Sequence, residues 1–189
     1  MADQLYLSYW ITGFGEQNML RYFEKTLRLF PFSRLNQNAS TLRITPISLT
    51  EPALFEQAFA PGFTVDEIMA AAREFRHADC VYQLDTCWDL WQREDDWKLE
   101  PSRVSLFCFG PEFERDLGEN VRIDFGVDAN FLPRTDVSSA LTTAQSNIRS
   151  LLKFVHDLDD ALGAARRQLW TESGESFSDR LQNIVAEES

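Results

Sequence analysis

Three strand-like runs decide the fold class of this chain: 80–93 (CVYQLDTCWDLWQR), 103–109 (RVSLFCF) and 120–128 (NVRIDFGVD). Apolar and polar residues alternate in the first and third runs. Because successive side chains of a strand point to opposite faces, the alternation predicts one buried face and one solvated, acidic face. The buried positions are Cys80, Tyr82, Leu84, Thr86, Trp88 and Leu90 in the first run and Val121, Ile123, Phe125 and Val127 in the third.

The connections between these runs predict an antiparallel meander. They are short and polar and contain the turn signals Pro101, Gly110 and Pro111. Parallel strands would need a crossover of about a dozen residues or more. Alternation over 4–12 predicts a further strand, and so does the run 41–49, where Pro46 indicates a strand edge or a bulge.

Apolar residues three and four positions apart predict helices over 16–30 and 64–75. Thr64 and Glu67 form a T-x-x-E capping box at the start of the second helix. Residues 51–59 are interpreted as a short helix that ends before Pro61 and Gly62. A longer apolar seam follows Pro133: Leu141, Ala144, Ile148, Leu151, Val155, Leu158 and Leu162, with Ala165 and Leu169 continuing the register if the helix survives Gly163. This seam fits either a helix lying across a sheet or a coiled-coil homodimer.

Together these elements predict an α+β fold. We expect a mixed, mostly antiparallel sheet of about five strands, with two shorter helices and a long C-terminal helix. The chain of 189 residues suits one domain. We place this domain at 1–170 and expect 171–189 to form a C-terminal tail with a weak helix over 177–185.

The charge of the chain favours some partners over others. With 30 acidic and 18 basic residues, the formal net charge is −12. Because phosphate backbones are bound mainly by Lys and Arg, direct nucleic-acid binding is disfavoured, and a basic protein is the better partner. No run is apolar enough for a membrane span. The odd number of cysteines, without CxxC spacing, indicates small hydrophobic residues in a reducing, cytoplasmic environment.

Few residues in the chain indicate catalysis. It has two histidines, His77 and His156, and lacks a phosphate-binding glycine loop or a nucleophile elbow, so we expect no cofactor. One enzymatic alternative remains, a metal-dependent hydrolase with a carboxylate cluster on the sheet face. Its ligands would come from Asp85, Asp89, Asp124 and Asp128.

The polar sheet face also carries aromatic residues. Trp91 shares a parity with Asp85 and Asp89, and Phe107 and Phe109 fall on the non-core side of the middle run. Aromatic anchors surrounded by charge are typical of a protein-binding surface, although a second core layer would give the same pattern. We therefore expect a soluble acidic interaction module without catalytic activity, with a possible homodimer through the long helix. A third hypothesis is a nucleic-acid mimic that occupies a basic groove of its partner with its carboxylates.

Overall fold

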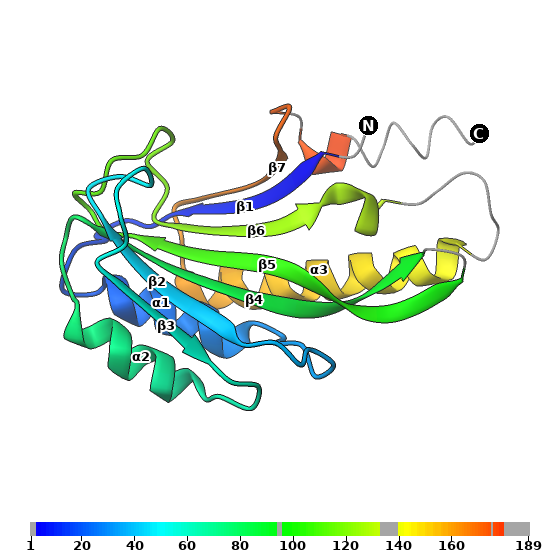
Figure 1. Ribbon diagram of the computed structural model, residues 1–189. Coiled ribbons are helices and arrows are strands. Elements are labelled where there is room, and N and C mark those ends of the chain that lie inside the picture. Colours follow the sequence, from blue (N-terminus) through cyan, green and yellow to red (C-terminus); the bar gives the residue numbers. More distant parts are fainter. Residues whose placement is uncertain (1–2, 94–95, 133–139, 175, 180–189) are drawn as a thin grey trace.

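The protein is built on one seven-stranded antiparallel sheet (Figure 1). A computed structural model describes residues 3–93, 96–132, 140–174 and 176–179. The strand order is β3-β2-β4-β5-β6-β1-β7. The N-terminal strand β1 therefore lies between β6 and β7, the last two strands along the sequence. The strands are β1 (Gln4–Trp10), β2 (Ser40–Pro46), β3 (Phe55–Phe59), β4 (Cys80–Arg93), β5 (Trp97–Phe109), β6 (Val121–Val127) and β7 (Arg166–Thr171).

This sheet corrects the predicted fold class. The sheet has seven strands rather than about five, and every pairing between its strands is antiparallel rather than mixed. The central meander β4-β5-β6 does form, but Pro101, which was expected in a connection, lies inside β5 and pairs with Asp89. Pro46 does not mark an edge strand or a bulge, because β2 pairs with β3 and β4 in unbroken register; it is the last residue of β2, where a missing backbone donor costs the sheet little.

Three α-helices cover one face of the sheet (Figure 1). They are α1 (Met19–Leu29), α2 (Val65–Glu74) and α3 (Ala140–Leu162), and a short 3-10 turn, η1 (Asp128–Asn130), follows β6. Side chains of all three helices share a single hydrophobic core with the even-numbered positions of β4, as in the contacts of Phe23 and Phe154 with Tyr82 and Trp88. The predicted parity of the buried face is therefore confirmed for β4 and for Val121, Ile123 and Phe125 of β6, whereas Val127 at the end of β6 is exposed.

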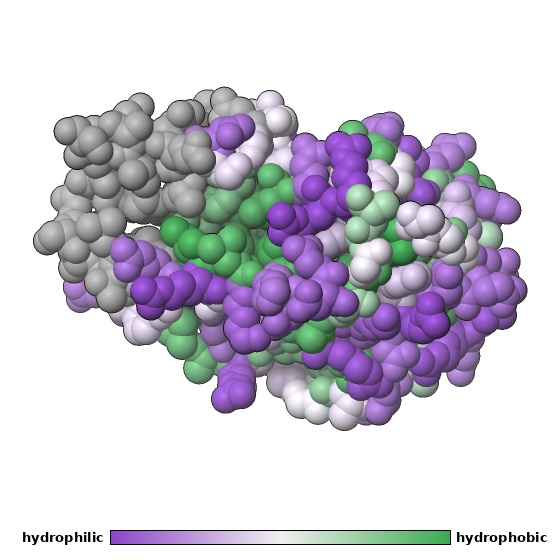
Figure 2. Space-filling view, turned by 180° about the vertical axis from the view of Figure 1, so that it is seen from behind, coloured by the Kyte–Doolittle hydropathy of each residue, from purple (hydrophilic) through white to green (hydrophobic). Residues whose placement is uncertain are grey.

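The apolar seam of α3 packs onto the sheet. Leu151, Val155, Leu158 and Leu162 are all buried within the single chain. Seen from the helix side, the surface is mostly hydrophilic, with a strip of hydrophobic residues beside the grey ones (Figure 2). Because the seam is buried in the core, a dimer would need other residues of α3, such as the exposed Leu152. The homodimer stays a prediction.

The prediction of a long C-terminal helix is wrong. The part of α3 whose side chains are described, 145–162, is an ordinary helix of about five turns. Gly163 then takes a left-handed backbone conformation with φ of 54° and ends the helix. Leu169 therefore belongs to β7, not to the helix. The terminal helix predicted over 177–185 lies mostly outside the described residues, and the domain boundary at 170 stays a prediction.

The short helix expected over 51–59 is also wrong. Residues 55–59 form the edge strand β3, which pairs only with β2. Its three central residues are exposed, so it lacks the buried alternation by which a strand is recognised.

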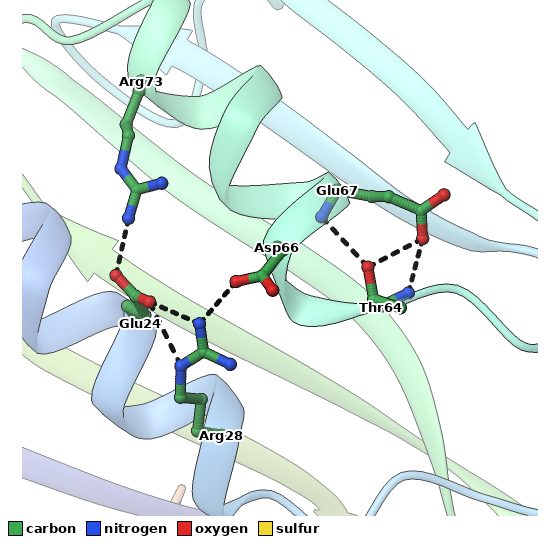
Figure 3. Close-up of polar contacts among 6 residues, drawn as sticks. All are labelled: Glu24, Arg28, Thr64, Asp66, Glu67 and Arg73. Carbon is green, nitrogen blue, oxygen red and sulfur yellow. Dashed lines mark hydrogen bonds and ion pairs between the residues drawn. The ribbon is translucent and has the colours of Figure 1, made fainter.

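The capping box is confirmed. Thr64 Oγ1 accepts a hydrogen bond from the Glu67 backbone N–H at 3.3 Å, and Glu67 Oε2 accepts one from the Thr64 N–H at 2.6 Å (Figure 3). The Glu67 carboxylate also accepts a hydrogen bond from Thr64 Oγ1 at 3.0 Å, and the bonds from the Thr64 N–H and Oγ1 hold the pKa of Glu67 below its usual value. They fix where α2 begins and therefore where its buried stripe meets the core.

Candidate functional site

The candidate site is the sheet face opposite the helices, which we call the open face. No described helix packs on it, and Figure 1 shows it toward the viewer. The strand registers align side chains from six strands in one line across this face. This line, the polar row, consists of Thr41, Asp85, Ser105, Asp124, Tyr6 and Trp170.

Asp85 lies at the centre of the open face and is held by three neighbours. Its carboxylate accepts hydrogen bonds from Ser105 Oγ and Gln83 Nε2, both at 2.7 Å. Arg43 lies 3.3 Å away and also pairs with Glu56 at 2.9 Å. The Asp85 side chain nevertheless remains 36% exposed. It is an oriented carboxylate that a partner can still reach.

Asp124 stands two strands from Asp85, with Ser105 between them in the register. Its carboxylate accepts a hydrogen bond from the Gly126 N–H at 2.9 Å. Burial raises the pKa of Asp124, and the nearby negative charge of Asp85 raises it further, although Gly126 and Arg122 oppose this. The two carboxylates therefore influence each other electrostatically across Ser105, although two strand spacings, about 10 Å, separate their backbones.

The other two acids of the predicted site lie elsewhere. Asp89 is about 13 Å along the strand from Asp85, and it accepts hydrogen bonds from Ser33 Oγ and from the Arg34 N–H at 2.8 Å. It therefore anchors the segment that follows α1. Asp128 is buried in η1, where its Oδ1 accepts a hydrogen bond from the Asp3 N–H at 3.0 Å. Of the four acids, only Asp85 and Asp124 lie in the same row across the sheet, with Ser105 between them.

Phe107 and Phe109 are buried, so they are not exposed anchors. Together with Val81 and Phe113 they form a separate small core on the open face. Phe113, from the segment after β5, covers them, and the Arg122 guanidinium lies 4.7 Å from the Phe107 ring centre. The second core layer considered from the sequence is thus present, but a connecting segment covers it instead of a helix.

Trp91 is half-buried at the far end of β4. Its backbone N–H donates to Asn147 Oδ1 at 3.0 Å, and its carbonyl accepts from Asn147 Nδ2 at 2.8 Å. Asn147 is a buried polar residue of α3 that our reading of the sequence missed. The signal in the sequence was a polar residue directly beside the apolar seam. In the structure, Asn147 ties the end of β4 to α3.

The sequence reading also missed aromatic residues of the polar row. The Tyr6 and Trp170 rings are in contact, with their centres 4.6 Å apart and their planes tilted by 30°. Tyr6 was on the polar side of the first predicted run, but Trp170 lay in a segment with no predicted strand. Beside the row, a hollow of about 600 Å³ is lined by Thr41, Asp85, Cys87, Arg103 and Ser105 among others.

The described residues contain no group of three or more His, Cys, Asp or Glu side chains that could hold a metal ion. Asp85 and Asp124 alone would give a metal at most two carboxylate ligands, whereas Mg²⁺ prefers six oxygen ligands. No described helix is long and apolar enough to cross a membrane.

Comparisons with protein-family models, curated proteins and solved structures found no match for this chain. The site must therefore be interpreted from its own geometry and chemistry.

Proposed function

We propose that the protein is a non-enzymatic binding module that contacts a basic protein through the open face. One observation carries this proposal: the helices cover one face of the sheet, while the other presents the polar row at its centre. An exposed sheet face that combines carboxylates with Tyr and Trp has the composition of a protein contact surface.

The electrostatics of the row favour a cationic partner. The Asp124 pKa is raised partly by the negative charge of Asp85, so the two carboxylates carry a repulsion that a bound Lys or Arg would relieve. Arg43 is shared between Asp85 and Glu56 and offsets this repulsion only in part. The net charge of −12 adds a long-range attraction that speeds the approach of a basic protein.

The aromatic end of the row supplies apolar contact area. Tyr6 and Trp170 are both half-buried, and the contact between their tilted rings restricts both side chains. Rigid aromatic side chains lose little conformational entropy on binding, which is why Tyr and Trp are common anchors at interfaces. We propose that carboxylates orient the partner while this pair provides much of the contact.

Removing the negative charges of the two polar-row carboxylates should weaken binding of a cationic probe. Asp85→Asn combined with Asp124→Asn is expected to reduce the affinity for fluorescently labelled oligolysine at least about tenfold, because charge-assisted hydrogen bonds to both carboxylates are lost. Fluorescence anisotropy titrations measure the affinity. The wild-type affinity should fall steeply as salt is added.

The matched control removes the same charge from the helix side. Asp157 and Asp160 lie on α3, so Asp157→Asn with Asp160→Asn lowers the net negative charge equally without touching the row. This variant should keep affinity within about twofold, since distant exposed charges are screened. An equal loss in both variants would mean that oligolysine responds to total charge, and the proposal would be rejected.

We also propose a reducing, cytoplasmic location. Cys80, Cys87 and Cys108 are free thiols, and Cys80 and Cys108 are buried. Burial raises the pKa of Cys80 to about 11, with a smaller contribution from the charge of Asp79. Such thiols are poorly reactive and behave as small core residues, in keeping with a chain that forms no disulfide framework.

A further inference from the structure

A second surface feature lies on the helix side, between α1 and α2. A hollow of about 560 Å³ is lined by Arg21, Arg73, Arg76 and His77, with Glu24 and Glu74 as its acids. Positive charge gathers here in a chain whose net charge is −12. Three guanidinium groups against two carboxylates give this lining a small positive excess on an otherwise acidic protein.

Glu24 does not neutralise this excess, because its carboxylate is already shared (Figure 3). Its Oε1 accepts from Arg28 Nη2 at 2.6 Å, and its Oε2 accepts from Arg73 Nη2 at 2.6 Å. Arg28 also forms an ion pair with Asp66 at 2.5 Å, and this pair links α1 to α2. This network leaves Glu24 with two cationic partners, Arg28 and Arg73.

Arg21 and Arg76 are the cations that remain. Both are exposed, and neither forms an ion pair with an acid in the described part of the chain. The Arg21 guanidinium lies 5.5 Å from the centre of the Tyr22 ring, which orients the group and leaves its N–H donors available. Two available guanidinium groups that line one hollow, against the remaining carboxylate of Glu74, can act together on a single anionic ligand.

We propose that this hollow binds a small phosphate-bearing molecule. The planar guanidinium group matches the oxygen geometry of phosphate and binds it through paired hydrogen bonds. The volume of the hollow admits a phosphoryl group with a substituent, in the range of small-molecule sites. A nucleic-acid polymer is disfavoured, because its extended backbone would meet the negative charge of the rest of the protein.

Inorganic pyrophosphate is the probe for this site. In ¹H–¹⁵N spectra of the full chain, pyrophosphate should shift the amides of residues around Arg21 and Arg76. Arg21→Gln with Arg76→Gln is expected to weaken binding at least about tenfold, because both charge-assisted contacts are removed. Both side chains are exposed, so the spectrum of the variant should otherwise remain that of the folded protein.

The control pair is Arg34→Gln with Arg103→Gln, which removes two exposed arginines away from this hollow. It should leave pyrophosphate binding unchanged. The proposal is overturned if this control loses as much affinity, or if sodium chloride at the same ionic strength reproduces the shifts. Tighter binding of polyuridylate than of pyrophosphate would also overturn it, since the ligand class would then be a polymer. The oligolysine experiment is independent of this result.

Discussion

Replacing Trp88 by alanine is expected to lower the free energy of unfolding by about 3–5 kcal/mol, the range for loss of a large aromatic residue from a core. Trp88 is 4% exposed, and its ring lies 5.9 Å from Phe30 and from Phe125 and 6.1 Å from Phe131 and Phe154. These four rings come from the end of α1, from β6 and the turn after it, and from α3. The cavity would therefore open where the sheet meets its helices.

Urea unfolding followed by circular dichroism measures this loss, and Trp91→Ala is the matched control. Trp91 is three positions along the same strand, on the open face, and only half-buried. Its replacement should cost clearly less than that of Trp88, because a side chain that is only partly buried loses less contact area when it is truncated. Equal destabilisation by the two substitutions would show that both faces of β4 are core, against the assigned parity.

Gly110→Ala is expected to destabilise the fold by about 3 kcal/mol or more. A Cβ at this position would lie 2.2 Å from the Ala78 carbonyl oxygen and 2.7 Å from that of Cys80. Both obstacles are backbone atoms, and the Gly110 N–H donates to the Cys80 carbonyl at 2.8 Å. The segment that covers Phe107 and Phe109 therefore has to move away from β4 to admit a methyl group.

Gly15→Ala is the comparison for this prediction. A Cβ at Gly15 would meet nothing within 4 Å, and its backbone is not in the left-handed region. The change should alter the unfolding free energy by no more than about 0.5 kcal/mol. If thermal or urea unfolding shows Gly110→Ala to be as mild as Gly15→Ala, the close approach of the chain to Ala78 and Cys80 is wrong.

The parts of the fold that were predictable are those with a strong local pattern. The alternation around Tyr82 and Trp88 identified the buried face of β4, since only that face contacts the helices. The Thr64–Glu67 box marked the start of α2, because capping depends on residues three positions apart. Both signals are complete within a few residues of sequence.

The parts that failed depend on contacts between distant segments. The edge strand β3 buries too little to show alternation. Leu169 of β7 falls on the heptad spacing of α3, although Gly163 ends the helix before it. Phe107 and Phe109 are buried by a connecting segment whose path no local pattern reveals. The polar row could not be foreseen, because Tyr6 meets Asp124 only when β1 inserts beside β6.

The proposed binding surface is tested most directly by mapping oligolysine onto the protein by amide chemical shifts in ¹H–¹⁵N spectra. We expect the largest chemical-shift changes on the polar row, at Asp85, Ser105, Asp124 and Tyr6. The amide shifts of α1, α2 and α3 should change little. Shifts concentrated on the helices, with the open face unchanged, would contradict it.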